Sequence, residues 1–451
     1  MTAAPRAESG RVGGAALAET CPPTIGEDIY RLVRDLFPIC RSIAGEGLRE
    51  TLRLLRRHVD LTIHEVPSGT HVLDWTIPKE WTIRDAYVRN ASGVRVVDFR
   101  ANNLHVMNYS VPVHAVMDLA ELREHIFTLP EQPDLIPYRK SYFEEGWGFC
   151  MAHRALAALP DGRYEVMIDA SHVDGSLSYG EYLHCGASES EVLLSSHICH
   201  PSLANDNCSG PALLALLASH LSNRRTRYSY RFLLGPGTLG AIGWLARNQA
   251  HLDRIEHGLV VACVGDGGGP TYKRSRRGDA LIDRASAHVL ARSGGKPRIL
   301  DYSPLGYDER QFCSPGFNLP VGLFQRSLYG SFPEYHTSAD NLDFVRAEHL
   351  AESFRTICAI IDVLEQDHCP RSLKMFGEPM LSRHGLFARV SRGGPGAPSN
   401  AALLWTLSLA DGSQSLLDIA ERADLPFADI ASAARALQAH GLLAPGEATS
   451  A

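Results

Sequence analysis

Between residues 137 and 366, short apolar runs alternate with segments of helical periodicity, and this alternation limits the folds open to the chain. Strands that read as near-continuous apolar runs are typical of sheets buried on both faces. Their alternation with helices favours a mixed, mostly parallel sheet covered by helices on both sides. We therefore expect an α/β fold, a three-layer sandwich. The expected strands are 192–196, 228–234, 258–264 and 319–324, and the expected helices are 211–221, 238–247, 280–291 and 347–364.

The segments before this region differ from it in character. Residues 27–58 place Leu, Ile and Val at helical spacing, so 23–60 and 136–390 are expected to form the main domain. Residues 61–135 hold short β-rich pieces separated by turn formers, which predicts a small inserted β domain. Residues 1–22 are rich in Ala, Gly, Glu and Arg and predict a disordered tail without the apolar stretch of a secretory signal.

The end of the chain predicts a separate module. The run Gly393–Ser399 is rich in Gly and Pro and is typical of a linker. Residues 398–446 hold three short helical pieces, which resembles a winged-helix module. Arg435 is the single arginine in 427–440, so partner docking or packing is favoured over DNA binding.

Composition narrows the class of protein. The chain has 451 residues, of which 45% are hydrophobic and 21% charged, as in ordinary globular proteins. The net charge of -7 argues against a nucleic-acid partner, and no apolar run is long enough to span a membrane. The ten cysteines include no short-spaced pair, which fits reduced thiols and a cytoplasmic location. A small-molecule or short-peptide substrate is expected, and a homo-oligomer is left open.

The segment 195–210 carries the strongest chemical signal. It connects the strand 192–196 to the helix 211–221 and contains His197, His200 and Asp206. Sites in α/β sheets lie at the carboxyl ends of strands, and imidazole and carboxylate groups are ligands that zinc prefers. The alternative is a loop with satisfied histidines and a helix cap around Asp206.

Later strand ends carry further candidates. Asp266 follows the strand 258–264, and His336 lies in the loop after 319–324, so both are candidate metal ligands, although turn and cap chemistry alone would also explain them. Between them stand two adjacent acids, Asp308 and Glu309. A metallohydrolase needs a carboxylate base beside its metal, which makes such acids of interest.

A basic patch, 272–277, follows the Asp266 loop. Its Tyr272, Lys273 and Arg276 are candidates for binding a substrate carboxylate or phosphate, because such groups suit Lys and the fork of Arg. The alternative is an ordinary solvated run of charges.

Taken together, these motifs resemble those of a known family. The strings Ser-His-Ile-Cys-His-Pro-Ser, Asn-Asp-Asn-x-Ser-Gly, Tyr-Lys-x-Ser-Arg and Pro-Glu-Tyr-His-Thr-Ser, with Trp-Gly-Phe-Cys at 147–150, are similar to those of the DUF4910 aminopeptidase-like proteins. Those proteins carry a DUF2172 insert and are related to the M28-type zinc aminopeptidases. The resemblance covers about residues 27–445 and implies a zinc-exopeptidase-like sandwich.

Position by position, the resemblance implies one or two zinc ions. His197 matches the first histidine ligand, Asp206 the bridging aspartate, Asp266 the carboxylate of the first metal and His336 the histidine of the second.

Two departures from the peptidase pattern stand out. Cys199 replaces the aspartate of the His-x-Asp motif, so His200 is expected to supply an extra ligand. The peptidases also carry a Glu-Glu pair after the strand that matches 228–234, where this chain has Gly-Pro-Gly-Thr at 235–238. Glu309 and Glu334 are therefore the candidates for the catalytic base.

The implied activity is zinc-dependent hydrolysis of an amide bond in a small peptide or acylated amine, as a tailoring step in a biosynthetic pathway. Three alternatives stay open. The missing Glu-Glu pair supports the first, a non-catalytic metal-stabilised binding protein. The others are a regulator acting through its C-terminal module and an acyl transferase or cyclase on the same scaffold.

Overall fold

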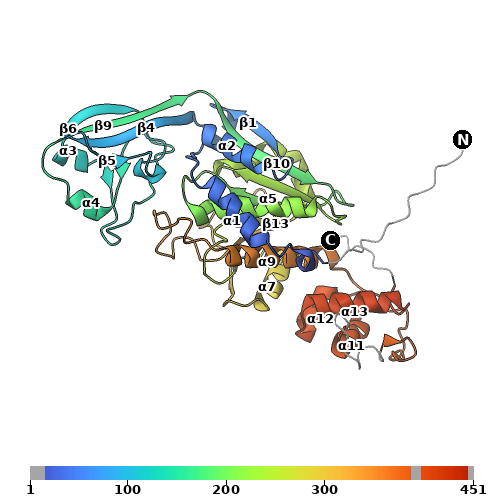
Figure 1. The fold of residues 1–451 in the computed structure, drawn as a ribbon. Coiled ribbons are helices and arrows are strands. Elements are labelled where there is room, and N and C mark those ends of the chain that lie inside the picture. Colours follow the sequence, from blue (N-terminus) through green and yellow to red (C-terminus); the bar gives the residue numbers. More distant parts are fainter. Residues whose placement is uncertain (1–15, 387–397, 445–451) are drawn as a thin grey trace, which may run out of the picture. The chain divides into compact units, whose positions relative to one another are not determined.

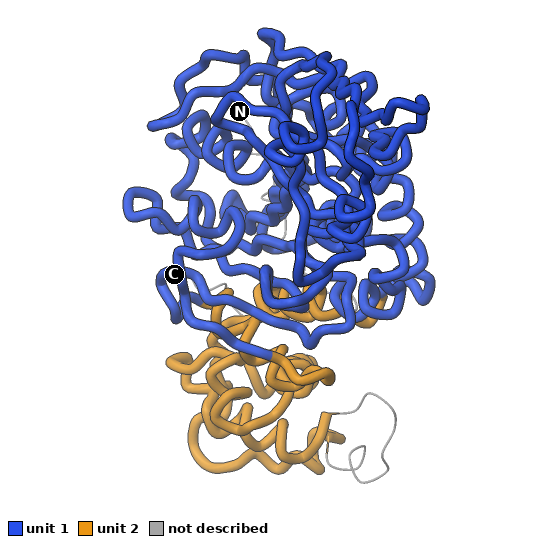
Figure 2. Tube along the Cα trace, turned by 90° about the vertical axis from the view of Figure 1, so that its left-hand side faces the viewer, with its two compact units in different colours: residues 1–12, 21–280, 298–354 blue, residues 13–20, 281–297, 355–451 orange. Residues whose placement is uncertain are grey.

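The computed structural model describes residues 16–386 and 398–444, which fall into two compact units (Figure 2). The first unit contains 21–280 and 298–354. The second contains 281–297 and the described residues after 354, together with the short segment before 21. Each unit is considered by itself.

A mixed sheet of eight strands forms the centre of the first unit (Figure 1). The strand order is β1-β10-β12-β11-β13-β16-β14-β15, and the inner strands β12, β11, β13 and β16 run parallel. Their parallel direction brings their carboxyl ends to one edge of the sheet. The strands are β1 Thr62–Pro67, β10 Ser176–His184, β11 Glu191–His197, β12 Ser229–Gly235, β13 Ile255–Val261, β14 Thr271–Lys273, β15 Arg298–Leu300 and β16 Val321–Gln325.

Helices cover both faces of this sheet. The connections β11–α5–β12 and β12–α6–β13 run in opposite directions across it, so right-handed crossovers place α5 (Ser209–Leu221) and α6 (Leu239–Asn248) on opposite faces. α1 (Ile25–Leu36) and α2 (Glu46–Leu55) pack against α5, as Figure 1 shows for α1. The expected α/β sandwich is therefore confirmed. The sequence periodicity placed the helices and the inner strands within a few residues of where they lie.

A second sheet, of four strands in the order β5-β4-β9-β6, forms the inserted β structure. Two expected boundaries of this insert are wrong. β1 belongs to the main sheet, because its six residues pair with β10, and β9 comes from beyond residue 135 to pair with both β4 and β6. Both boundaries depend on strands that pair although they lie far apart in the sequence. Short β-rich runs do not show which strands will pair. The strands are β4 Glu80–Asn90, β5 Arg95–Asp98, β6 Val113–Asp118 and β9 Arg163–Val173.

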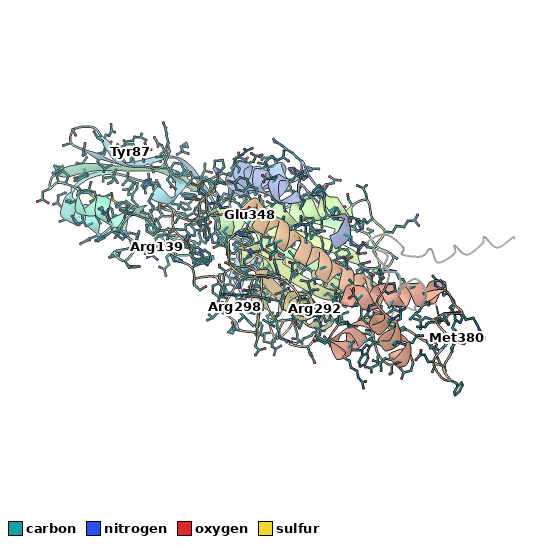
Figure 3. All side chains as sticks on the ribbon, turned by 60° about the horizontal axis from the view of Figure 1, so that its bottom comes forward. Tyr87, Arg139, Arg292, Arg298, Glu348 and Met380 are labelled. Atoms are coloured by element: carbon teal, nitrogen blue, oxygen red, sulfur yellow. The ribbon has the colours of Figure 1, made fainter. Side chains whose placement is uncertain are left out.

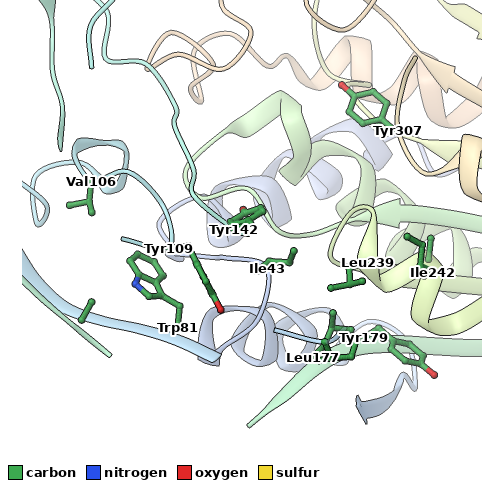
Figure 4. Close-up of a cluster of buried hydrophobic side chains, with 14 of the residues drawn as sticks. Ile43, Trp81, Val106, Tyr109, Tyr142, Leu177, Tyr179, Leu239, Ile242 and Tyr307 are labelled. Carbon is green, nitrogen blue, oxygen red and sulfur yellow. The ribbon is translucent and has the colours of Figure 1, made fainter. Parts of the chain in front are cut away.

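One apolar core joins the two sheets of the first unit (Figure 4). Trp81 of β4, Leu177 of β10 and Leu239 of α6 all belong to it and are at most 4% exposed. The indole N–H of Trp81 donates to the carbonyl of Ser110 at 2.9 Å, so its polar atom is satisfied inside this core. The smaller elements are β2 His71–Val72, β3 Trp75–Thr76, β7 Ile126–Phe127, β8 Phe149–Cys150, α3 Leu119–Arg123, α4 His153–Ala157 and α8 Glu309–Phe312.

The second unit is helical and contains the C-terminal module. Its helices are α7 Leu281–Ala291, the later part of α9 Ala347–Gln366, α11 Asn400–Leu409, α12 Leu416–Ala423 and α13 Phe427–Ala439. α12 begins with a capping box in which Ser415 and Asp418 bond reciprocally. Isolated bridges join Arg371 to Asp411 and Ser372 to Leu443, so the module begins before the expected residue 398. Most of the expected linker, residues 393–397, lies outside the described residues.

The expected disordered tail, 1–22, is corrected at its end. Leu17 is 4% exposed, and its N–H and that of Ala18 donate to the Asp362 carboxylate at 2.7 and 2.9 Å. Residues 1–15 lie outside the described residues. Among the described helices none is both long enough and apolar enough to cross a bilayer.

Candidate metal centre

His197 is the last residue of β11, and the turn 204–208 that precedes α5 brings Asp206 back beside it. His197 Nε2 lies 3.0 Å from Asp206 Oδ1. His200 Nδ1 lies 3.2 Å from His197 Nε2 and 3.6 Å from Asp206 Oδ1. All three residues are buried, with exposed fractions of 2%, 8% and 0%. The strand-to-helix connection thus brings together the three ligands expected from it.

His336 joins this group from the loop after β16. Its Nε2 lies 3.0 Å from Asp206 Oδ2, and its ring centroid is 5.1 Å from that of His200. Its φ of 55° is in the left-handed region, which a residue with a side chain adopts rarely and mostly where the surroundings hold it. Asp206 therefore bonds to imidazoles from two different strand ends.

The donor atoms fit a zinc ion. The candidate ligand atoms of His197, His200 and Asp206 all lie within 4.8 Å of one another. Ligands at the usual zinc distances of about 2.0–2.2 Å in a tetrahedron are separated by about 3.3–3.5 Å. The observed separations of 3.0, 3.2 and 3.6 Å bracket that value. Two imidazoles and a carboxylate, with a fourth position left open, are also a donor set that catalytic zinc accepts.

Burial sets the protonation of the group. Burial lowers the pKa of His200 from 6.5 to about 3, against the opposing charge of Asp206, so the imidazole is neutral at pH 7 and able to bind a cation. Burial by itself would raise the pKa of Asp206. Electrostatic interaction with His200 and hydrogen bonds from His197, His200 and His336 outweigh it and lower that pKa well below its ordinary value.

Asp266 lies outside the group of ligand atoms and has a different place. Its Oδ2 accepts from Asn205 Nδ2 at 2.8 Å, and its Oδ1 accepts from Ser327 Oγ at 2.6 Å and from the N–H of Gly268 at 2.7 Å. Both carboxylate oxygens are thus bound to protein donors. β13 ends at Val261, three residues before the expected strand end, so Asp266 sits further along the loop than a strand-end ligand would.

Asp340 supports the metal centre from the His336 loop. Its carboxylate accepts the backbone N–H of Asn205 at 2.6 Å and that of Asp206 at 2.9 Å. Burial raises its pKa to about 8, while these two N–H groups lower it. Its place in the sequence was compatible with a simple turn, and its true partners lie more than 130 positions away.

Arg41 is a further support that sequence reasoning missed. The guanidinium is 2% exposed and donates to the carbonyls of His200 at 2.8 Å and Leu36 at 2.7 Å, and to Cys208 Sγ at 3.0 Å. It therefore holds the loop that carries His200 and Asp206. A lone arginine between two helices gives no signal in a single sequence, because nothing near it in the chain marks its role.

The basic patch does not form the expected clamp. Tyr272 and Lys273 are buried in β14, with exposed fractions of 0% and 2%, and the Lys273 ammonium lies 2.5 Å from Glu309 Oε1. Arg276 is exposed and donates to Asn318 Oδ1 at 3.2 Å. The first two side chains are closed off from substrate because β14 is an inner strand between β16 and β15, and side chains on both of its faces are buried.

The two expected catalytic acids lie in different surroundings. Glu309 is fully buried, and besides Lys273 it binds the N–H of Tyr307 at 3.0 Å, so both of its oxygens are occupied. Glu334 is half-buried two residues before His336 and keeps its place as a candidate. Asp308, the acid next to Glu309, is the buried carboxylate beside His197. Burial raises its pKa to about 7, and the charge of His197 lowers it.

Aromatic rings enclose the histidines. Tyr307 stacks on His197 with ring centroids 4.9 Å apart, and Tyr335 stacks on His336 at 4.0 Å. Tyr138 meets His200 and His336 edge-on at 5.2 and 5.1 Å. These rings limit the orientations of the imidazoles and exclude water from their flanks.

A cavity of about 280 Å³ opens beside His336. Tyr138, Tyr335 and Phe332 line it, and Arg139, which is exposed and labelled in Figure 3, lies at its side. Small-molecule sites are concave, and this cavity combines the aromatic rings with the polar groups of Gln132, Arg139 and His336.

Comparison with known proteins identifies the family. Residues 30–367 match the domain of unknown function DUF4910. The chain belongs to the DUF4910 family. Residues 368–445 match a winged helix-turn-helix family, which confirms the expected module and places its start 30 residues before the expected 398.

Relatives of this DUF4910 chain agree with the assignment. A Clostridium acetobutylicum protein, provisionally named a polysaccharide biosynthesis protein with an aminopeptidase-like domain, is 49% identical over 412 residues, or 91% of this chain and 95% of its own. A crystal structure of a provisionally named peptidase from the same organism has 48% identity and a TM-score of 0.89 over 95% of this chain and 97% of its own.

The fold extends to the zinc aminopeptidases. A zinc aminopeptidase from Bacillus subtilis has a TM-score of 0.54 at 12% identity, over 75% of this chain and 95% of its own. At this identity the similarity establishes a shared fold. The expected relationship to the M28-type enzymes is confirmed at that level.

Proposed function

We propose that this protein is a zinc-dependent hydrolase that cleaves an amide bond in a small peptide or acylated amine. The observation that carries the proposal is the convergence of His197, His200 and His336 on the Asp206 carboxylate, at donor separations of 3.0 to 3.6 Å. The aminopeptidase-like naming of the Clostridium relative supports the same class of reaction.

We propose one zinc ion, held by His197, His200 and Asp206, with His336 bonded to the second oxygen of the Asp206 carboxylate. Asp266, the carboxylate expected for a two-metal site, is bonded to Asn205, Ser327 and Gly268. Zinc bound at such a site polarises a carbonyl group and lowers the pKa of water to about 7. The protein's own aromatic groups hold the imidazoles in place, with Tyr307 stacked on His197 and Tyr335 on His336.

The cavity beside His336 is the proposed place of the substrate. Its aromatic walls suit the apolar part of a small molecule, and the Arg139 guanidinium at its side suits a carboxylate or other anionic group. A volume of about 280 Å³ limits the bound part of the substrate to a small group rather than a folded protein.

The test begins with metal content. Protein reconstituted with zinc is expected to hold one ion and to hydrolyse at least one member of a panel of aminoacyl anilides and N-acyl amines. A chelator should abolish the activity, and added zinc should restore it. His197→Ala should lose both zinc and activity. His114→Ala, at a histidine whose side chain is 71% exposed, is the matched control and should lose neither.

A different outcome would point to another class of protein. Bound zinc without turnover of any panel member would favour a metal-stabilised binding protein over a hydrolase.

A further inference from the structure

Asp308 carries a buried carboxylate without a bonding partner. The residue is 3% exposed, and among the residues that the structure describes nothing donates a hydrogen bond to its side chain or pairs with it as an ion. It stands at the N-cap position of α8, where an aspartate ordinarily accepts an N–H of the first turn, yet it makes no such bond. A buried charge needs compensation, so this side chain lacks a partner that a ligand or a reacting group could supply.

The Asp308 carboxylate lies against the turn after β12, on the side where this turn meets His197. A Cβ atom placed on Gly237 would lie 3.3 Å from Asp308 Oδ1 and 3.1 Å from His197 Cβ. Glycine at 237 therefore leaves the space in which Asp308 approaches His197. Any larger residue there would crowd both of them.

Neighbouring residues fix Asp308 in this position. Glu309 is held by Lys273, whose ammonium also donates to the carbonyls of Ser303 and Leu305 at 3.1 and 2.5 Å. On the other side, Tyr307 stacks on His197, and its hydroxyl lies 3.0 Å from Cys263 Sγ. The buried ion pair thus anchors the loop that presents both Tyr307 and Asp308 to the metal centre.

We propose that Asp308, rather than Glu309 or Glu334, is the catalytic carboxylate of this site. This proposal rests on the proposed hydrolase function. The oxygen of a water molecule forms a bond to the amide carbonyl carbon as its proton passes to the Asp308 carboxylate. The C–N bond then breaks, and Asp308 gives that proton to the leaving nitrogen. The products are a carboxylic acid and an amine, and Asp308 ends as it began.

Asp308→Asn is the central test, because it keeps the shape of the side chain and removes the proton acceptor. Removal of a general base is expected to lower kcat about 10²- to 10⁴-fold. Zinc stoichiometry and zinc affinity, measured by competition with a chelator, should stay within about twofold of the parent, since the proposed ligands are intact. Asp301→Asn, at an aspartate whose side chain is 99% exposed, is the matched control and should leave kcat unchanged.

A binding measurement separates this proposal from the proposed function. Acetohydroxamic acid must give up its O–H proton to bind zinc as an anion, and a nearby carboxylate can take that proton. We expect Asp308→Asn to weaken binding of this probe to the zinc-loaded protein at least about tenfold, and Asp301→Asn to leave it unchanged. The measurement needs no substrate, so it decides the role of Asp308 even if no panel member is hydrolysed.

Two results would overturn the assignment. One is a kcat of Asp308→Asn within about tenfold of the parent, where the parent is active. The other is equal binding of acetohydroxamic acid by the parent and Asp308→Asn, at whatever affinity. A loss of activity that appears in Glu334→Gln instead would move the role to that residue.

Discussion

At the residue scale, Asp206 shows how a single carboxylate organises the centre. One oxygen lies 3.0 Å from His197 Nε2 and the other 3.0 Å from His336 Nε2. The Asp340 carboxylate accepts the backbone N–H of Asp206, so the backbone that carries the Asp206 side chain is held in place. The residue types were predictable from a short motif. The bond to Asp340, 134 residues away, was not.

Arg41 gives the first prediction at this scale. Arg41→Lys keeps the charge but cannot reach the three acceptors of the planar guanidinium, which include the His200 carbonyl. We expect zinc affinity to fall about 10- to 100-fold, as is usual when a group that orients metal ligands is lost. Competition with a zinc chelator measures the change. Arg53→Lys, whose side chain is 56% exposed, is the control, and an equal loss in both variants would contradict the prediction.

At the scale of elements, β14 and α8 support the site rather than contact the substrate. Lys273 of β14 and Glu309 of α8 form an ion pair in which the side chains are 2% and 0% exposed. Both were expected to act on the substrate because charged residues near ligand loops often do. Burial, of Lys273 on an inner strand and of Glu309 in α8, changes their role, since neither side chain lines the cavity.

Breaking this pair should destabilise the fold. Lys273→Met leaves Glu309 buried and unpaired, which typically costs about 3–5 kcal/mol of folding free energy. The double variant Lys273→Met, Glu309→Met removes both charges and should recover a large part of that loss. Urea unfolding followed by circular dichroism measures both. A single variant as stable as the parent would show that the pair is not structurally required.

The packing of α7 against α13 predicts a pH dependence of stability in the second unit. His288 Nε2 accepts the N–H of Phe427 at 3.0 Å, and burial, aided by Arg292, lowers the pKa of His288 from 6.5 to about 4. The folded state therefore needs the neutral imidazole. Above pH 6.5 this contribution is fully present, and it is lost as pH falls from 6.5 to about 4, because the unfolded chain then binds a proton that the folded state does not.

His288→Gln tests this dependence. Comparing urea midpoints at two pH values, one above and one below 6.5, should show a smaller acid loss in His288→Gln than in the parent. His251→Gln, at an exposed histidine, should keep the dependence of the parent. Identical behaviour of His288→Gln and the parent would assign the acid sensitivity to other groups.

At the scale of the whole molecule, the winged helix-turn-helix module lacks the basic excess of a typical DNA-binding domain. Over the matched residues 368–445, seven Lys and Arg side chains are balanced by six acidic ones. Asp418 and Glu421 pair with Arg284, and Arg435 is bonded to Gln366. The charged groups of Asp418, Glu421 and Arg435 are therefore bonded to other residues of the second unit.

We therefore expect the full chain not to bind DNA specifically. Fluorescence anisotropy with a short labelled duplex at physiological salt should give a Kd weaker than about 10⁻⁴ M, the weak end of non-specific binding. A DNA-binding protein of known affinity serves as the positive control for the assay. Tight binding that weakens steeply with salt would contradict this expectation and revive a regulatory role for the module.

The sequence by itself determined the fold class and the kinds of ligand at the site. Apolar periodicity is a local property, so buried strands, helices and the metal-binding loop of His197 and Asp206 were predictable from neighbouring residues. The sequence also indicated that a carboxylate should lie near the metal. Only the tertiary structure decided that Asp308 faces the Gly237 turn while Glu309 turns to Lys273. The physical reason is that the side chains of the adjacent residues Asp308 and Glu309 point in different directions. Which of them lies near His197 depends on how separate loops pack together in the fold.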